Sequence, residues 1–253
     1  MDLNGTAAIV TGGASGLGAA TATALAGQGA KVAVIDLNEA AAKSVATRIG
    51  AIAIGCDVGD AASAEAAFVR ARAAHGGARV LVNCAGIGVA GRIVGKEGPL
   101  KLADFERVIR VNLTGTFNML RLAAAEMSML DPREDGERGV IVNTASVAGY
   151  EGQVGQAAYA ASKAGVIGLT IQAARELARS GIRVMTIAPG LIHTPMFGGL
   201  PQEVQDNLAA SVPYPPRLGK PEEYAALVLH IAGNRFLNGE TIRLDGALRM
   251  APR

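Results

Sequence analysis

TAAIVTGGASGLG, residues 6–18, is the stretch of sequence that decides the fold. Its first half, Thr6–Thr11, is a short apolar run that predicts a strand, and a helical pattern over Gly16–Gln28 follows the glycines at once. Glycines permit a tight turn and let the backbone approach a pyrophosphate, while unpaired N–H groups at the start of a helix attract an anion. The stretch therefore predicts the strand, turn and helix that open a nucleotide-binding α/β sheet.

Beyond this stretch, short apolar runs alternate with longer helical patterns to the end of the chain. Further strands are predicted at Lys31–Asp36, Ala51–Cys56, Arg79–Asn83, Gly139–Thr144, Ile182–Ala188 and Glu240–Leu244. Further helices are predicted at Glu39–Ile49, Ala61–Ala74, Leu102–Leu130, Ala157–Arg179 and Pro221–Ala232. Strict alternation, with strands that are apolar throughout, is typical of a parallel sheet covered on both faces. We expect a doubly wound, Rossmann-type sheet of seven strands in a single domain that spans residues 1–253.

Two segments interrupt this alternation. Asp131–Arg138 (DPREDGER) is charged and carries Pro and Gly, so we predict an exposed loop there. Gly190–Pro216 is long, rich in Pro, Gly and apolar residues, and follows the carboxyl end of a predicted strand. Long loops at that edge of an α/β sheet usually carry function, so residues 190–216 are predicted to form a substrate loop.

Composition excludes several classes of function. Half of the residues are hydrophobic and 18% are charged, which is enough apolar material for a large core. A net charge of +2 and the absence of Trp give no reason to expect a nucleic-acid or membrane partner. Cys56 and Cys84 lie beside predicted strands without disulfide or metal-ligand spacing, so we expect buried free thiols and no metal. With no signal peptide and no membrane-length apolar run, the chain is expected to be cytoplasmic.

The glycines have the spacing G-x-x-x-G-x-G, formed by Gly12, Gly16 and Gly18. Asp36 ends the second predicted strand, and a carboxylate there can accept hydrogen bonds from the adenosine ribose hydroxyls. The same carboxylate would repel a 2′-phosphate, and neither Ser15 nor Leu37 offers a cation to neutralise one. The sequence therefore predicts NAD rather than NADP as the cofactor.

Tyr159 and Lys163 lie four residues apart in a predicted helix, so their side chains share one face. A free Tyr titrates near pH 10 and is a poor base at neutral pH. We expect the Lys163 ammonium, together with an oxidised nicotinamide ring, to lower the pKa of the phenol. Such a pair suits a base that takes the proton of an alcohol while hydride leaves to NAD. Ser146 lies 13 residues before Tyr159, at the end of the fifth strand.

Together these motifs resemble the short-chain dehydrogenase/reductase family over essentially the whole chain. The resemblance implies a catalytic tetrad of Asn112, Ser146, Tyr159 and Lys163. By the same resemblance, Ser146 binds the substrate oxygen, Lys163 also holds the ribose hydroxyls, and Asn112 anchors a water that relays protons to Lys163.

The family also implies a set of cofactor contacts. Asp57 and Val58 match its adenine-binding pair, the segment 83–86 (NCAG) supports the sheet and lines the cofactor, and the segment 189–194 contacts the nicotinamide half. The full set of residues predicted to bind the cofactor is Gly12, Ser15, Gly16, Leu17, Gly18, Asp36, Asp57, Val58, Asn83, Cys84, Ala85, Gly86, Tyr159, Lys163, Pro189, Gly190, Ile192 and Thr194.

Three segments, 152–159, 182–191 and 236–246, resemble one branch of the family, the type II 3-hydroxyacyl-CoA dehydrogenases, also described as hydroxysteroid dehydrogenases. This resemblance implies oxidation of (S)-3-hydroxyacyl-CoA to 3-oxoacyl-CoA, a step of fatty-acid metabolism, by a homotetramer. Apolar residues of the substrate loop would suit an acyl chain or a steroid; they are Met196, Phe197, Leu200, Val212 and Tyr214.

Other functions stay open at this point. A related 3-oxoacyl-carrier-protein reductase, or another alcohol or steroid dehydrogenase, has the same motifs, although Asp36 counts against an NADPH-using reductase. A scaffold or RNA-processing subunit that keeps the fold belongs to a different class, and the intact tetrad argues against that as the sole role. His193, in the substrate loop, is a minor candidate for a substrate contact.

Overall fold

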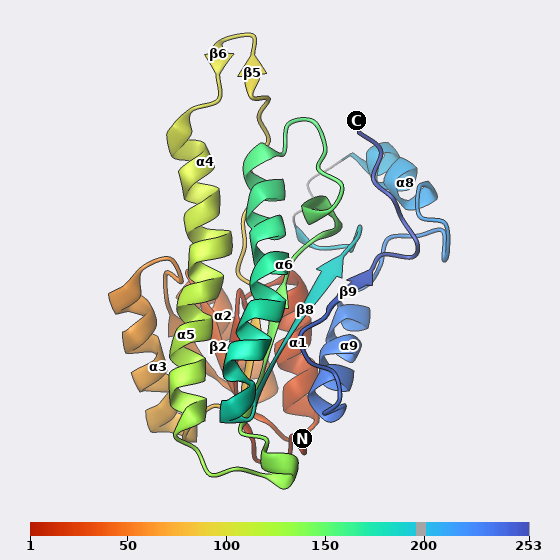
Figure 1. The fold of residues 1–253 in the computed structure, drawn as a ribbon. Coiled ribbons are helices and arrows are strands. Elements are labelled where there is room, and N and C mark those ends of the chain that lie inside the picture. Colours follow the sequence, from red (N-terminus) through yellow and green to blue (C-terminus); the bar gives the residue numbers. More distant parts are fainter. Residues whose placement is uncertain (196–200, 253) are drawn as a thin grey trace.

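A computed structural model describes residues 1–195 and 201–252, and within them seven parallel strands form one sheet (Figure 1). The strands are β1 (Ala7–Thr11), β2 (Lys31–Asp36), β3 (Ile52–Gly55), β4 (Val80–Asn83), β7 (Gly139–Thr144), β8 (Ile182–Pro189) and β9 (Thr241–Leu244). Their order is β3-β2-β1-β4-β7-β8-β9, and every neighbouring pair is parallel. The predicted doubly wound sheet of seven strands is therefore confirmed.

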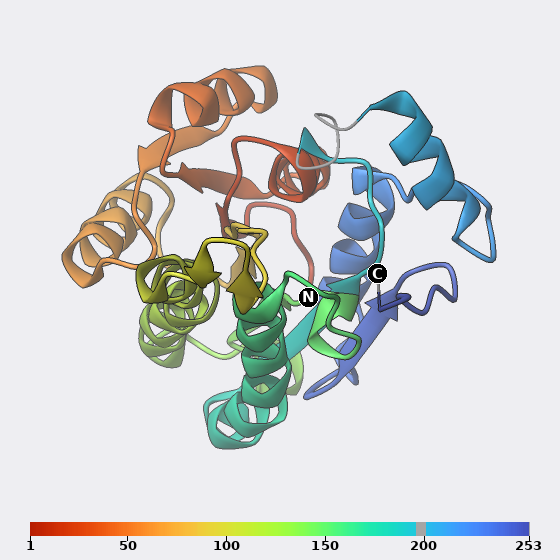
Figure 2. The same ribbon diagram turned by 90° about the horizontal axis from the view of Figure 1, so that it is seen from above.

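Helices cover both faces of the sheet (Figures 1 and 2). One layer consists of α1 (Gly16–Gly27), α2 (Glu39–Ile49) and α9 (Pro221–Gly233), and the other of α3 (Ala61–His75), α5 (Gly115–Ser128) and α6 (Ala157–Leu177). Successive strand residues point to opposite faces, so Val10 packs into the first layer and Ile9 into the second. This double burial explains why the strands carry continuous apolar runs.

Local signals set the ends of several helices. Asn38 and Asp60 cap α2 and α3, because their side chains accept hydrogen bonds from the Ala41 and Ser63 N–H groups. Gly50 ends α2 in the left-handed conformation, with φ of 67°, which glycine adopts without a steric penalty. Asn38 and Asp60 thus start the helices that leave the carboxyl edge of the sheet, and Gly50 turns the chain back to the amino end of β3.

The predicted helix Leu102–Leu130 is not one regular helix. It consists of α4 (Leu102–Ile109), a π-helical turn at Arg110–Thr114 and α5, which are joined end to end (Figure 1). Apolar periodicity does not distinguish an α-turn from a single π-turn, because the latter adds only one residue. The prediction was therefore right about the extent of the helical segment and wrong about its regularity.

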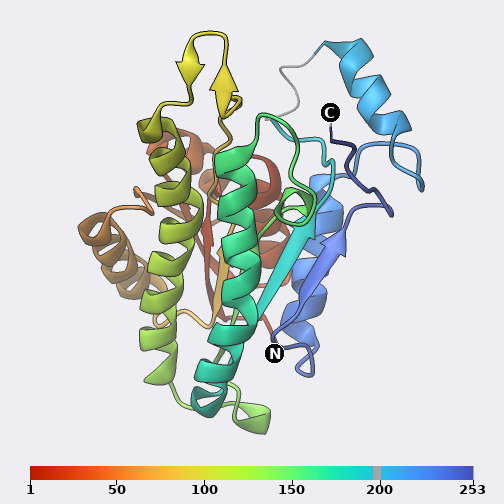
Figure 3. The ribbon, with the colours of Figure 1, turned by 45° about the horizontal axis from the view of Figure 1, so that its top comes forward.

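Two further elements were not predicted. A short hairpin of β5 (Val94–Gly95) and β6 (Gly98–Pro99) projects from the top of the molecule, and α8 (Gln202–Ala210) lies within the predicted substrate loop (Figure 3). Two-residue strands leave no alternating pattern, and α8 buries no residue fully, so its sequence has no strong apolar stripe.

Parts of two other predictions also need correction. Glu137, within the predicted exposed loop 131–138, is only 5% exposed and pairs with Arg183 at 2.9 Å. Of the two free thiols, Cys56 is buried and Cys84 is only partly buried. Among residues 1–195 and 201–252, no helix is both long and apolar enough to cross a membrane.

Candidate active site

The residues predicted to form the site follow the carboxyl ends of six parallel strands, β1 to β4, β7 and β8. Because these ends meet at one edge of the sheet, the glycine turn after β1 comes close to the ends of β2 and β4, and Ser146 after β7 comes close to the start of α6. In a sheet of this order, the crevice between β1 and β4 is where the winding reverses, and ligands bind at such a point.

The glycine turn at residues 12–18, here called the cradle, has space for a ligand that larger side chains would fill. A Cβ on Gly12, whose φ is +63°, would lie 2.7 Å from the Ala85 nitrogen, and a Cβ on Gly18 would collide with the Gly12 carbonyl oxygen. Ser15 is the N-cap residue of α1 but accepts no side-chain hydrogen bond from its first turn. The N–H groups of that turn are therefore available to an anion, which fits a dinucleotide pyrophosphate.

Thr194, predicted to contact the nicotinamide half of the cofactor, lies beside this cradle. Its Cγ2 would be 3.3 Å from a Cβ placed on Gly16, so the segment after β8 approaches the start of α1. Ile192 is buried behind it, and Gly190 packs against Asp245, leaving no space for a side chain.

Asp36 is held rigidly at the end of β2. Its Oδ2 accepts a hydrogen bond from the Ala14 N–H at 3.1 Å, and its Oδ1 accepts one from the Asn38 N–H at 3.0 Å. Ala14 was not among the predicted site residues, because its contribution is a backbone N–H. The bond fixes the carboxylate against the glycine turn, where the ribose of a bound dinucleotide would lie.

Asp57 is already engaged within the protein. Its Oδ2 pairs with Arg110 Nη1 at 2.9 Å, and its Oδ1 accepts from the Gly59 N–H. Val58 is buried and packs closely against Gly115, where an added Cβ would lie 2.7 Å away. The pair therefore joins the end of β3 to the π-turn and α5, and Arg110 is not free to neutralise a 2′-phosphate.

Asn83 faces its neighbouring strands. Its Nδ2 donates to Asn143 Oδ1 at 3.0 Å, and its carbonyl oxygen accepts from Thr144 Oγ1 at 2.6 Å. The next residues are tied to β1, because the Ala85 N–H donates to Thr11 Oγ1 at 3.2 Å. These buried bonds hold the ends of β1, β4 and β7 in register, the supporting role that the resemblance implied for Asn83.

Tyr159 and Lys163 share a face of α6, with the Lys163 Nζ 5.6 Å from the centre of the Tyr159 ring. The ammonium is buried and donates to the Thr144 carbonyl oxygen at 2.7 Å. Burial lowers the pKa of Lys163 to about 8. The ammonium is thus directed to the end of β7, next to the turn that carries Ser146.

Burial also raises the pKa of the Tyr159 phenol, and a hydrogen bond with Ser146 acts in the opposite direction. Without the cofactor, the ammonium is bonded to Thr144 and lies 5.6 Å from the centre of the phenol ring, while both groups lose hydration. That Lys163 and an oxidised nicotinamide ring together lower the pKa of this phenol therefore stays a prediction.

Asn112 lies in the π-turn and is fully buried. Its Oδ1 accepts from the Ile87 N–H at 2.8 Å, and its Nδ2 donates to the Ile87 carbonyl and to Ser162 Oγ. Gly86 separates it from the catalytic helix: a Cβ there would lie 3.4 Å from Asn112 Oδ1 and 3.6 Å from Lys163 Nζ. Sequence reasoning missed Ser162 and Ile87, although Ser162 directly precedes Lys163.

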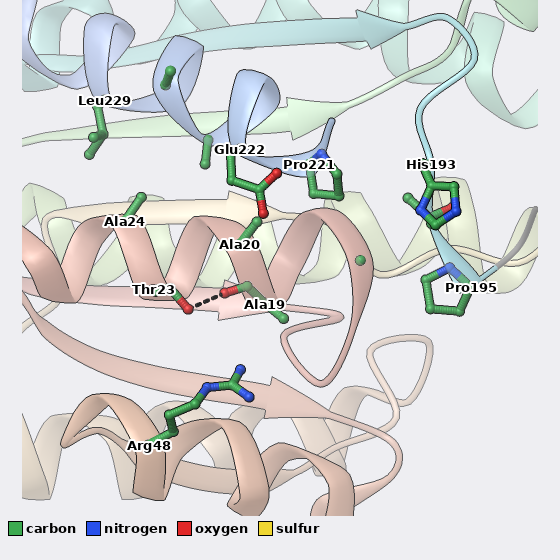
Figure 4. A pocket seen from close by; sticks show the side chains of 14 residues that line it. Ala19, Ala20, Thr23, Ala24, Arg48, His193, Pro195, Pro221, Glu222 and Leu229 are labelled. Atoms are coloured by element: carbon green, nitrogen blue, oxygen red, sulfur yellow. Dashed lines mark hydrogen bonds between the residues drawn. The ribbon is translucent and has the colours of Figure 1, made fainter. Parts of the chain in front are cut away.

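The substrate loop is described only in part, since Met196, Phe197 and Leu200 lie outside the described residues. Val212 is buried, whereas Tyr214 is 80% exposed. His193 lines a different feature, a groove of about 760 Å³ along the outer side of α1, with Arg48 and Glu222 on its walls (Figure 4).

Comparison with known proteins agrees with this geometry. A family model described as short chain dehydrogenase matches residues 6–205. The chain is 53% identical to 3-hydroxyacyl-CoA dehydrogenase type-2 of Bos taurus, covering 99% of this chain and 97% of that protein, and 50% identical to the Drosophila melanogaster protein of the same name, with coverages of 96% and 97%. The crystal structure of 3-hydroxyacyl-CoA dehydrogenase type-2 from Mycobacterium avium superposes with a TM-score of 0.94 at 46% identity, covering 98% of both chains.

Proposed function

Because this chain belongs to the short-chain dehydrogenase family and is an oxidoreductase, we propose that it interconverts (S)-3-hydroxyacyl-CoA and 3-oxoacyl-CoA with NAD as cofactor. The observation that carries the proposal is the convergence of Ser146, Tyr159 and Lys163 beside a glycine cradle that ends at Asp36. The substrate class rests on the names of relatives that match over nearly the full length of the chain.

Asp36 supports NAD over NADP. Two backbone N–H groups hold its carboxylate in place, and Arg110, which follows α4, is paired with Asp57. A 2′-phosphate at this position would face an anion that cannot turn away. The ribose hydroxyls of NAD would instead donate to it.

When bound, NAD supplies the acceptor or donor of hydride. The chain's own residues handle the proton and the substrate oxygen. Ser146 is placed to donate a hydrogen bond to that oxygen, next to the Tyr159 phenol. Because burial keeps the phenol protonated, Tyr159 is ready to donate a proton when a ketone is reduced. In the oxidising direction, a positive charge next to the phenol is needed before it can accept the proton.

The first experiment is to follow the absorbance of reduced nicotinamide with acetoacetyl-CoA, with NADH and NADPH in parallel. We expect oxidation of NADH and little of NADPH. Equal rates with both cofactors would contradict the role of Asp36. Binding of NADH without turnover would contradict the substrate class and favour a different ketone or the scaffold role.

Tyr159→Phe removes the proton donor but keeps the ring. We expect kcat to fall by roughly 10²- to 10⁴-fold, with the Kd for NADH, measured by its fluorescence, unchanged. A retained rate would refute the assignment of Tyr159.

The homotetramer and the cytoplasmic location remain predictions. Light scattering tests the homotetramer.

A further inference from the structure

The segment 245–252, here called the strap, runs back over the carboxyl edge of the sheet after β9 (Figure 3). It contacts the loop 150–156, which leads directly into α6 and Tyr159. The Val154 N–H donates to the Pro252 carbonyl oxygen at 3.0 Å, and the Gln153 Nε2 donates to the Ala251 carbonyl oxygen at 2.9 Å. On its far side the same loop is held by the Gly91 N–H, which donates to the Gly155 carbonyl oxygen at 2.8 Å.

Charged side chains fasten the strap to this loop. Glu151 is the shared acceptor: its carboxylate pairs with Arg243 at 2.9 Å and with Arg249 at 3.5 Å, and it accepts from the Met250 N–H at 2.8 Å. Asp245 completes the network, with Arg243 at 2.7 Å and Arg249 at 3.2 Å. These arginines hold the pKa of Glu151 below its ordinary value, so the carboxylate stays charged.

The other side of the strap packs on the substrate loop. Leu248 is buried against Leu191 and Val212, and Leu208 of α8 packs on the same cluster. The Tyr214 N–H donates to the Gly246 carbonyl oxygen at 3.2 Å. The strap is thus the piece of chain that contacts both the loop before Tyr159 and the loop predicted to bind substrate.

We propose that the Glu151–Arg243–Asp245–Arg249 network makes the strap a positioning element for substrate binding, which sets the position of the loop 150–156 relative to Leu191 and to the segment 208–214. Glu151 is its central positioning residue. The inference rests on the proposed function, because it takes these segments to be the ones that contact the acyl-CoA. Loosening the strap lowers the affinity for substrate and leaves the proton transfer at Tyr159 intact.

Glu151→Ala and Arg249→Ala test this from the two ends of the network. We expect KM for acetoacetyl-CoA to rise, about tenfold in Glu151→Ala and less in Arg249→Ala, whose side chain is 62% exposed. The kcat and the Kd for NADH should stay within about twofold of wild type. Glu151→Gln, which keeps the shape and one acceptor oxygen, should restore part of the affinity. The matched control is Arg70→Ala, which breaks an exposed pair with Glu39 that has no part in this network.

Hydrogen exchange at the Val154 amide reports on the strap without any substrate. Faster exchange in Glu151→Ala together with a raised KM supports the proposal. Faster exchange with an unchanged KM, or a variant in which only kcat falls, contradicts the proposal. If the wild type does not reduce acetoacetyl-CoA, the proposed function fails. In that case, unchanged hydrogen exchange at Val154 in Glu151→Ala and Arg249→Ala would separately contradict the proposal that this network holds the strap in place.

Discussion

Lys163 is 4% exposed, and its ammonium has the Thr144 carbonyl as its acceptor. Its pKa in the folded protein is about 8, below the value of an unfolded lysine. Between these two values the unfolded chain binds more protons than the folded one, so stability rises with pH. The burial cost is therefore fully present below pH 8 and is relieved as the pH increases.

A comparison with Lys163→Met measures this effect. We expect the free energy of unfolding of the wild type to increase by about 2 kcal/mol relative to the variant between pH 7 and pH 9.5. Urea unfolding at a series of pH values checks it. A difference between the two proteins that does not change with pH would mean that the ammonium titrates normally.

At single positions, the sequence predicted which side chains meet more reliably than how they behave. The i, i+4 spacing placed Tyr159 and Lys163 on one face, and they share that face in the folded protein. The spacing did not show that burial raises the pKa of Tyr159 or that Lys163 bonds to Thr144, because both depend on the packed interior. Ala14 and Ile87 contribute through their backbones, which no residue type signals.

The π-turn at Arg110–Thr114 places Asn112 where its amide can bond both the N–H and the C=O of Ile87. π-turns inside α-helices often mark functional sites. The loop that Asn112 holds follows β4 and faces Lys163 across Gly86. The irregular turn therefore fixes the wall of the site next to the catalytic helix.

Asn112→Ala leaves the peptide groups of Ile87 without partners inside the protein. We expect a loss of about 2 kcal/mol or more in stability and a fall in kcat of roughly tenfold or more, since the wall next to Lys163 is displaced. Asn118→Ala is the matched control, because this buried Asn of α5 also bonds two carbonyls, those of Val58 and Asp60. Equal effects of the two variants on kcat would contradict a specific role for Asn112.

Regular elements were predictable to within a few residues because their apolar patterns are long. Three elements are exceptions. The strands β5 and β6 are too short to show a pattern, and α8 has no stripe of buried residues. Their conformation depends on contacts with distant segments, and α8 rests on the strap, which comes last in the chain.

Arg183 links parts of the fold that are far apart in sequence. From β8 it pairs with Glu137 at 2.9 Å and donates to the carbonyls of Ile231 and Ala232 at the end of α9, and to that of Leu237. A cation at the carboxyl end of a helix offsets its dipole and satisfies its last carbonyls. This role of Arg183 could not be predicted from the sequence, because its partner Glu137 lies in a charged segment that looks fully solvated.

Arg183→Met removes the nearest cation from the buried Glu137 carboxylate, which keeps the Met1 ammonium at 3.6 Å and Arg235 at 3.4 Å, and it takes the donor from three carbonyls. We expect it to destabilise the fold by about 3–5 kcal/mol, and Glu137→Gln introduced together with it to recover part of the loss. Urea unfolding of both single variants and the double variant gives the coupling. Fully additive losses would show that the two side chains do not depend on each other.

The strand order has a consequence for a chain that is still being synthesised. β1 and β4 lie side by side at the centre of the sheet, yet the other partner of β4 is β7, which leaves the ribosome only after α4 and α5. Until then, the apolar β4 is an open edge, and unpaired apolar edges promote association between chains. The glycine turn and Asp36 have been made by then, whereas Ser146, Tyr159 and Lys163 come later in the chain.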